Sequence, residues 1–383
     1  MNRRELGIYV HIPFCARKCA YCDFLSFPAD AMLQRRYFRS LRQEIASFSL
    51  AGDYEAVSVY VGGGTPSLPC PEEITQTLEQ IRRVFCVRED AEITIECNPG
   101  TLDRERLAVY RRAGFNRLSI GLQSADHTLL KALGRIHSWE TFLEEYENAR
   151  EAGFENINVD LMYGLPGQSL SSFAGTLSEV AALRPEHVSA YSLIIEEGTP
   201  FWERYHEDDE AKRRGDRPLF LPDEDTEDRM TRMLKDSLRE IGMYRYEISN
   251  YAIPGKESRH NTGYWIRREY AGFGLGASSQ IGKSRYRNTP LLEAYLETPL
   301  LREEETLLGR EDEISETMIL GLRMTEGVDL VRFEEQFQVR AEDLFAKEIG
   351  QFRKMGLLEL SGRHLRLTDR GFDVSNLVMC EFL

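Results

Sequence analysis

The chain of 383 residues lacks any long apolar run and has no excess of positive charge. A helix that crosses a bilayer needs roughly 20 consecutive apolar residues, and no segment approaches that length. Acidic side chains (63) outnumber basic ones (48), so the net charge of −15 gives no general attraction for nucleic acid. The short apolar segment 7–14 leads into a cysteine rather than a small-residue cleavage site. We therefore expect a cytoplasmic protein without a transmembrane segment.

Cysteine is scarce as well, and the seven present form an odd set that does not suggest a framework of disulfides. Three of them, Cys15, Cys19 and Cys22, follow the pattern C-x-x-x-C-x-x-C, which chance produces with an expectation of roughly 0.002. Three thiolates leave a closed zinc site one ligand short. They would also leave one iron of a four-iron cluster open to a ligand that is not protein. The alternative is three buried structural cysteines.

The first half of the chain alternates between strand-like and helix-like segments. The strand-like segments are Leu6–Phe14, Val57–Val61, Ala91–Glu96, Arg117–Gln123, Ile157–Tyr163 and His187–Ile195. The helix-like segments are Met32–Phe48, Pro71–Phe85, Asp103–Ala113, Thr141–Ala152 and Leu170–Leu183. Gly114 and Gly153 follow two of these helices as expected C-caps. The alternation predicts an α/β fold with a parallel sheet, and the unbroken apolar strands favour a barrel or partial barrel over an open sheet.

The second half predicts a different organisation. The highly charged segment Glu203–Arg229 indicates a solvated surface excursion. Beyond about residue 300 the pattern is helical up to Lys354, and it ends in a hairpin of Leu357–Leu360 and Leu365–Thr368 that is typical of a winged helix. We expect a barrel with an extension over residues 1–300, its core at about 5–200, and a helical, winged-helix-like domain over 301–383. The acidic charge of that domain argues against DNA binding.

Polar residues gather where the predicted strands end, which is where barrel-like α/β proteins place their chemistry. The three cysteines follow the first strand, and the glycine run Gly62–Pro66 follows the second and lets a ligand touch the backbone. Glu96, Gln123 and Asp160 lie at the next three strands. A carboxylate such as Glu96 can bond ribose hydroxyls. Each residue alone is typical of an ordinary polar group at a loop. Together they predict a ring of polar groups around the open end of the barrel.

These features resemble the radical S-adenosylmethionine superfamily, and the segment Tyr9-Val-His-Ile-Pro-Phe14 resembles its oxygen-independent coproporphyrinogen III oxidase group. The resemblance implies a partial (β/α)6 barrel and a [4Fe-4S] cluster on Cys15, Cys19 and Cys22, with S-adenosylmethionine on the fourth iron. Arg135 would face the methionine carboxylate and Tyr21 the adenine. The residues implied at the S-adenosylmethionine site are Tyr9, Tyr21, Gly63, Gly64, Thr65, Glu96, Gln123, Arg135 and Asp160.

Two features divide the oxidases from a second branch of this group. The oxidases resemble C-x-x-x-C-x-x-C-x-C, whereas Phe24 stands here at the last position. The segment His260–Trp265 resembles the H-N-x-x-Y-W motif of HemW-type haem chaperones, which implies that His260, Asn261, Tyr264 and Trp265 contact haem. An imidazole can ligate haem iron, and aromatic rings offer apolar area to a macrocycle. Without the resemblance, His260 reads as a loop histidine beside two core aromatics.

Two functions follow from the resemblance. The first is a chaperone that binds haem and transfers it to apo-haemoproteins, including respiratory ones, with an electron donor as a further partner. The second is an oxygen-independent coproporphyrinogen III oxidase, in which the cofactor supplies a radical for oxidative decarboxylation. The sequence does not decide whether the protein is an enzyme, and it leaves open a peripheral contact with a membrane. No nucleic-acid partner is expected.

Overall fold

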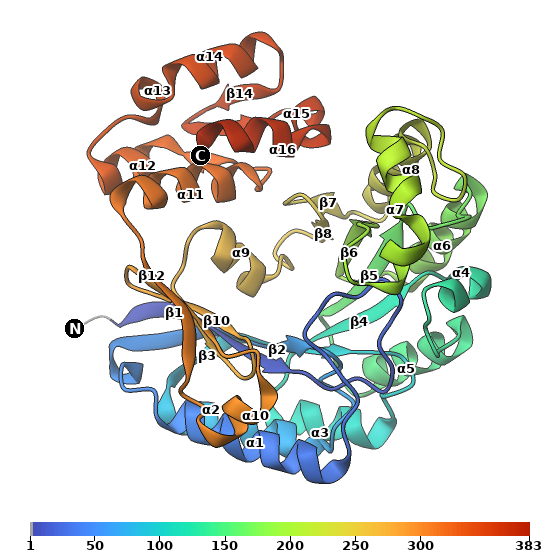
Figure 1. The fold of residues 1–383 in the computed structure, drawn as a ribbon, viewed down its shortest axis with the longest axis vertical. Coiled ribbons are helices and arrows are strands. Elements are labelled where there is room, and N and C mark those ends of the chain that lie inside the picture. The colour runs from blue at the N-terminus through green and yellow to red at the C-terminus, as the bar shows by residue number, and fades with distance from the viewer. Residues whose placement is uncertain (1–2) are drawn as a thin grey trace.

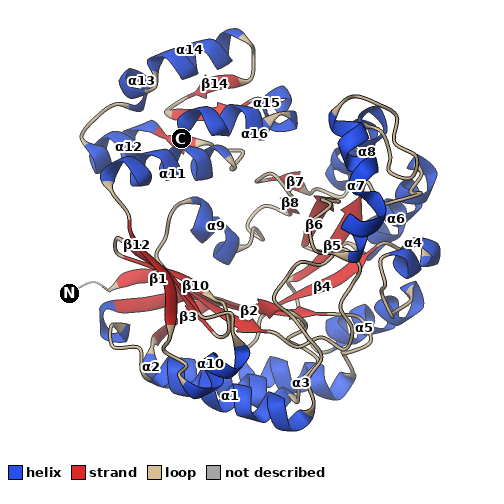
Figure 2. Cartoon of the chain, in the orientation of Figure 1, coloured by secondary structure: helices blue, strands red, loops and turns tan. Residues whose placement is uncertain are grey.

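The large sheet of the protein has six parallel strands at its centre, in the order in which they occur along the chain (Figures 1 and 2). The computed structural model describes residues 3–383. These strands are β1 (Arg4–Ile12), β2 (Tyr54–Gly63), β3 (Cys86–Cys97), β4 (Arg117–Gln123), β5 (Ile157–Tyr163) and β6 (His187–Ser192). β1 and β6 do not pair with each other, so the sheet curls without closing. The predicted α/β fold with a partial (β/α)6 barrel is confirmed.

Helices cover the outer face of this sheet and leave its concave face free (Figure 2). They are α1 (Ala31–Ala46), α2 (Pro71–Val84), α3 (Arg104–Ala113), the short α4 (His127–Ala132), α5 (Trp139–Glu151) and α6 (Leu170–Leu183). Side chains of Asp30, Asp103 and Ser169 cap α1, α3 and α6 by accepting from backbone N–H groups. Gly114 and Gly153 adopt φ of 99° and 88° behind two helices, which confirms the predicted caps. β4 is buried along its whole length, as its largely apolar sequence predicts.

Further strands extend the sheet beyond both ends of the barrel. β9 (Tyr270–Phe273) runs parallel to β1, and β10 (Ser278–Ile281), β11 (Ser284–Asn288) and β12 (Arg302–Leu307) follow it in antiparallel order. At the other end lie β8 (Asn250–Ala252) and β7 (Tyr244–Arg245), while α9 (Arg259–Trp265) and α10 (Leu292–Glu297) connect these strands. The predicted helical pattern is therefore wrong at β12, which pairs with β11. The boundary at residue 300/301 stays a prediction, and we propose that the second domain begins after β12.

The charged segment Glu203–Arg229 is mostly exposed, in keeping with the predicted solvated surface excursion, but a buried carboxylate anchors it. Most of it lies in α7 (Pro200–Arg213) and the start of α8 (Glu224–Glu240). The buried carboxylate of Asp208 accepts backbone N–H groups of the connecting loop, 2.9 Å away at Leu219 and 3.0 Å away at Leu221. This network fixes a packed lobe beside α6, visible at the right of Figure 1.

The C-terminal domain has a core of its own and a three-stranded antiparallel sheet. Its elements are α11 (Arg310–Leu322), β13 (Val328–Asp329), α12 (Leu330–Phe337), α13 (Ala341–Leu344), α14 (Ala346–Lys354), β14 (Leu358–Ser361), β15 (His364–Leu367), α15 (Asp369–Asp373) and α16 (Ser375–Met379). The pairing of β14 with β15 confirms the predicted hairpin. Glu316 of α11 ties the domain to the barrel, because it accepts from Arg267 at 3.2 Å and from Arg285 at 2.6 Å. Among residues 3–383, no helix is both long and apolar enough to span a bilayer.

Candidate functional site

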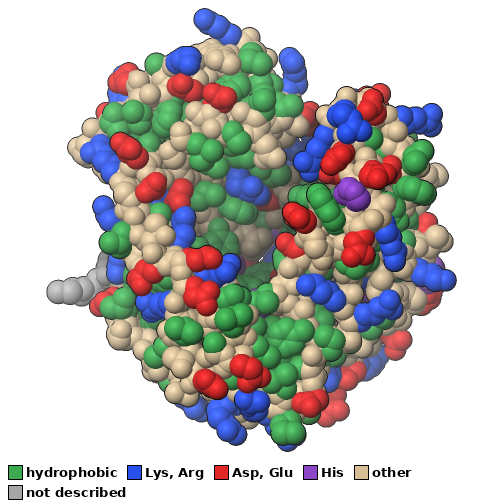
Figure 3. Space-filling model, in the orientation of Figure 1, with side chains coloured by type: hydrophobic (Ala, Val, Ile, Leu, Met, Phe, Trp, Pro, Cys, Tyr) green, Lys and Arg blue, Asp and Glu red, His purple; other side chains and the backbone are tan. Residues whose placement is uncertain are grey.

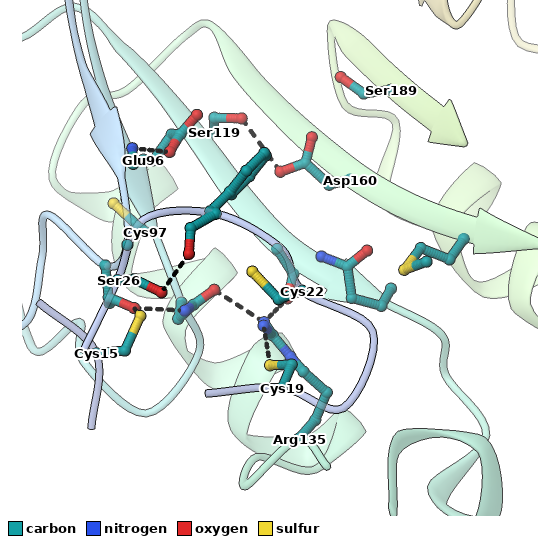
Figure 4. Close-up of a pocket in the computed structure, with 18 of the residues that line it drawn as sticks. Cys15, Cys19, Cys22, Ser26, Glu96, Cys97, Ser119, Arg135, Asp160 and Ser189 are labelled. Carbon is teal, nitrogen blue, oxygen red and sulfur yellow. Dashed lines mark hydrogen bonds between the residues drawn. The ribbon is translucent and has the colours of Figure 1, made fainter. Parts of the chain in front are cut away.

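A cavity of about 320 Å3 lies inside the curl of the sheet, between the strands and the cysteine loop (Figure 4). Side chains from β2 to β6 line it, because alternate residues of each strand point to the concave face. The structure thus brings most of the predicted site residues to one place. Those that line the cavity are Cys15, Cys19, Cys22, Tyr21, Gly63, Gly64, Thr65, Glu96, Gln123, Arg135, Asp160 and Asn261.

The cysteine loop is held against the sheet by backbone hydrogen bonds. The N–H of Cys15 donates to the carbonyl of Phe27 at 3.1 Å, and the N–H of Thr65 donates to the carbonyl of Phe14 at 2.7 Å. Gly64 packs directly against this segment, since a Cβ atom there would lie 2.8 Å from the Phe14 oxygen and 3.1 Å from the Cys15 sulfur. The glycine run therefore serves to bring the second strand into contact with the loop that carries the thiols.

A polar chain connects two of the three thiols. Nη1 of Arg135 donates to the sulfur of Cys19 at 3.6 Å, and Nη2 donates to Oδ1 of Asn98 at 2.9 Å. Nδ2 of Asn98 donates to Oγ1 of Thr65 at 2.7 Å, which lies 3.5 Å from the sulfur of Cys15. Figure 4 shows Arg135 beside Cys19 at the loop. Asn98 was not among the predicted site residues, although a polar residue directly after a buried strand is a usable signal.

Two buried carboxylates stand on the strands behind the loop. Glu96 accepts the hydroxyl of Tyr60 at 2.7 Å and the N–H of Gly63 at 2.9 Å, and burial raises the pKa of Glu96 to about 7. Asp160 accepts Nδ2 of Asn158 at 2.7 Å, and burial likewise raises the pKa of Asp160 above its usual range. Both are acceptors for a ligand's hydroxyl or amino groups, and Glu96 changes its protonation close to neutral pH.

Four predicted residues do not line the cavity, and His260 is the clearest case. Its ring is 4% exposed and stacks on Tyr60, with ring centroids 5.0 Å apart. Its Nδ1 lies 3.0 Å from Oγ of Ser58 and its Nε2 lies 3.0 Å from Oη of Tyr264. Burial lowers the pKa of His260 to about 3. Tyr9 lies beside it, with ring centroids 6.4 Å apart. In this structure His260 is a neutral core imidazole with both nitrogens hydrogen-bonded.

The helix α9 divides the motif between two faces. His260 and Tyr264, four residues apart, point into the barrel core, whereas Asn261 faces the cavity. Trp265 meets the C-terminal domain, because the guanidinium of Arg323 lies 4.1 Å from its ring centroid. The assignment of all four to one haem surface stays a prediction.

Comparison with known families gives two matches. Residues 9–180 match the Radical SAM superfamily, and residues 308–374 match the HemN C-terminal domain. The first match identifies the cofactors as a [4Fe-4S] cluster and S-adenosylmethionine. Within residues 3–383, no three acidic, histidine or cysteine side chains converge as they would on a single metal ion. A cubane spreads its ligands over separate irons, so three free thiols around one cavity fit a cluster better than an ion.

Comparison with individual proteins extends this result to the whole chain. The haem chaperone HemW of Lactococcus lactis is 36% identical over 100% of this chain and 98% of its own length. HemW of Bacillus subtilis is 35% identical over 98% of both chains. The structure of coproporphyrinogen III oxidase (HemN) from Escherichia coli, a radical SAM enzyme, gives a TM-score of 0.84 at 25% identity, covering 99% of this chain and 90% of that one. The chain belongs to the radical S-adenosylmethionine superfamily and, within it, to the family of HemW haem chaperones.

Proposed function

We propose that this protein is a cytoplasmic haem chaperone that binds haem and transfers it to apo-haemoproteins, respiratory ones among them. The observation that carries the proposal is the full-length similarity to relatives named haem chaperone HemW. The cysteine loop supports it, because the side chain at position 24 is a phenylalanine and is 61% exposed. An exposed aromatic ring beside Cys22 offers apolar contact to a ligand or partner rather than a fourth thiol.

The cavity supports the cofactor part of the proposal. Cys15, Cys19 and Cys22 would hold the cluster, and the remaining predicted residues of the cavity would surround S-adenosylmethionine. Arg135 would place positive charge beside the cluster, since it already donates to the sulfur of Cys19. Glu96 would accept from the ligand's hydroxyl or amino groups. Reduction of the cluster would require an electron donor as a partner.

Haem would bind over α9, in the hollow that Figure 3 shows between the C-terminal domain and the lobe of α7 and α8. Asn261 and Tyr191 lie at the cavity wall below this hollow. Ile266, which follows α9, and Ile194, which follows β6, are exposed apolar side chains. Such side chains suit a flat macrocycle. Iron ligation by His260 would require its hydrogen bond to Tyr264 to break.

Haem titration followed by absorbance tests the proposal with two matched variants. His260→Ala should weaken haem binding, whereas His187→Ala should not, although His187 is also buried with both ring nitrogens hydrogen-bonded, to Asn158 and Tyr246. Equal effects of the two variants would assign His260 a packing role only. Transfer is measured by mixing the haem-loaded protein with apomyoglobin. Weak, unsaturable binding by the wild type would refute the chaperone proposal.

A second candidate is the coproporphyrinogen III oxidase activity, which the TM-score of 0.84 to HemN favours. The same cavity would then present the cofactor to a tetrapyrrole substrate. An anaerobic reaction with reductant, S-adenosylmethionine and coproporphyrinogen III separates the two functions. Protoporphyrinogen formed over many turnovers would support the oxidase, and its absence in a cluster-loaded sample that binds haem would support the chaperone.

A further inference from the structure

Arg135 is the basic residue that the structure ties to the cysteine loop. The basic side chains that line the cavity are Arg17, Lys18, Arg117 and Arg135. Among the described residues, Arg135 is the one that hydrogen-bonds to a thiol of the loop, since its Nη1 donates to the sulfur of Cys19 at 3.6 Å (Figure 4). A ligand on the cluster would therefore lie within reach of this guanidinium.

The donors of Arg135 are only partly used. A guanidinium has five N–H donors. Nη2 donates to Oδ1 of Asn98 at 2.9 Å and also to the carbonyl of Gly121, and Nη1 donates to Cys19. Nε is buried and has no hydrogen-bond partner within residues 3–383. A buried donor without a partner costs free energy, so this side of the guanidinium is suited to a ligand that accepts hydrogen bonds.

Asn98, which directly follows β3, has a fixed backbone. Its N–H donates to Oγ of Ser67 at 3.3 Å, and its carbonyl accepts the hydroxyl of Thr101 at 2.6 Å. The turn that follows is held from α5, because Oε1 of Glu145 accepts the N–H of Leu102 at 3.0 Å. The Asn98 side chain therefore starts from a backbone position that leaves it little freedom.

The amide of Asn98 is bonded at both ends. Oδ1 accepts from Arg135, while Nδ2 donates to Oγ1 of Thr65 at 2.7 Å. Gly121 leaves the space for this contact, since a Cβ atom there would lie 2.9 Å from Oδ1 of Asn98 and 3.1 Å from Nη2 of Arg135. Rotation of the amide would break two hydrogen bonds, so Asn98 is a rigid support for the guanidinium.

We propose that Asn98 is a positioning residue that holds Arg135 ready for the carboxylate of S-adenosylmethionine. The inference rests on the proposed place of S-adenosylmethionine in this cavity. A neutral amide suits the role, because it orients the guanidinium and leaves its positive charge to the ligand, whereas a carboxylate at the same place would neutralise that charge. Donors that are fixed before binding also lower the entropic cost of binding.

The experiment measures how strongly the protein prefers a ligand with the carboxylate. Calorimetry on the anaerobic, cluster-loaded protein compares the affinity for S-adenosylmethionine with that for decarboxylated S-adenosylmethionine, and iron analysis checks the loading of each variant. The wild type should bind the carboxylate form at least about 10-fold more tightly. Asn98→Leu, which removes both hydrogen bonds at similar size, should reduce this preference by on the order of 10-fold.

Two further variants separate positioning from a role in the turn alone. Asn98→Asp keeps the size of the side chain but places a negative charge against Arg135, so the preference should fall, whereas a residue that only shaped the turn would tolerate the change. Arg135→Met should lower the preference by itself. Asn98→Leu in that background should lower it no further, because the two residues act as one unit.

Asn148→Leu is the matched control. Asn148 of α5 is 8% exposed and its Oδ1 accepts from Nε of Arg104 at 2.8 Å, but it does not line the cavity. This variant should keep the wild-type preference, although it loses the same kind of hydrogen bond.

The proposal is overturned if the wild type binds both forms equally, if Asn98→Leu keeps the preference, or if the losses in the double variant add. A wild type that binds neither form would refute the place of the cofactor as well, so the two failures are distinguishable. Should Asn98→Leu not fold or not hold iron, Asn98→Asp decides by the same ratio of affinities.

Discussion

Replacing Gly64 by alanine should remove the cluster while leaving the barrel folded. The new Cβ atom would meet backbone atoms of Phe14 at 2.8 and 3.0 Å and the sulfur of Cys15 at 3.1 Å. Ordinary contact begins at 3.4 Å, so the loop must move by 3.4 − 2.8 = 0.6 Å at the Phe14 oxygen and by 3.4 − 3.1 = 0.3 Å at the sulfur. Overpacking of this kind costs roughly 1–3 kcal/mol.

The displacement would strain the hydrogen bond from the N–H of Thr65 to the carbonyl of Phe14, which is 2.7 Å long and holds the cysteine loop in place. The first thiol would then move relative to Cys19 and Cys22, which lie on the far part of the loop. We expect less than about half the wild-type iron per chain after anaerobic reconstitution, since misplaced ligands bind metal poorly. Iron analysis and the cluster absorbance measure this effect, and far-ultraviolet circular dichroism reports the fold.

The control is Gly175→Ala in α6, where a Cβ atom meets nothing within 4 Å. Alanine is favoured over glycine inside a helix by about 0.5–1 kcal/mol, so this variant should keep its iron and gain stability. A Gly64→Ala variant with a full complement of iron would refute the argument that the glycine run positions the thiols.

Three further predictions follow from the site and the domain interface. Cys15→Ala should abolish the cluster absorbance without unfolding the barrel, whereas Cys380→Ala, at an exposed cysteine, should not change it. Burial raises the pKa of Glu96 to about 7, so the folded state favours the protonated carboxyl. Its contribution to the free energy of unfolding is complete below about pH 4.5 and is lost as the pH rises through 7. Glu96→Gln should therefore unfold at a higher temperature than the wild type at pH 8 and at a similar temperature at pH 4.5. A difference in unfolding temperature that does not change with pH would contradict this prediction. Glu316→Gln leaves Arg267 with a weakened partner, so limited proteolysis should cut faster between the two domains; an unchanged cutting rate would argue against the ion pair as a tie.

The strands and helices of the barrel were predictable because burial on both faces leaves a local mark in the sequence. β4 has the predicted ends, and Gly114 has the predicted left-handed conformation. β12 was not predictable, because its exposed, charged sequence carries no apolar pattern and the strand forms by pairing with β11. The helix α7 was not predicted, since its many charged residues hide the two inward residues Phe201 and Asp208.

The gathering of Cys15, Cys19 and Cys22 at one cavity was predictable, because the three cysteines lie close together in the sequence. The position of His260 was not, because its partner Ser58 lies 202 residues earlier in the chain. Arg117 was overlooked, although it alternates with Leu118 and shares a face with Ser119 in a strand that reads as apolar. A polar side chain at every second position of a buried strand would have indicated a face turned towards a hollow interior.

The seven-residue helix α9 contacts both the C-terminal domain and a strand that lines the cavity. Arg323 of the C-terminal domain clamps Trp265, while His260 lies flat on Tyr60, whose hydroxyl reaches Glu96. Two turns of a packed helix have little room to absorb a rotation, so a tilt of the C-terminal domain would displace the side chains at the cavity wall. By the reciprocity of linked equilibria, a ligand that binds at Glu96 more tightly in one placement of the C-terminal domain would also favour that placement, and α9 is the contact through which the two would be linked.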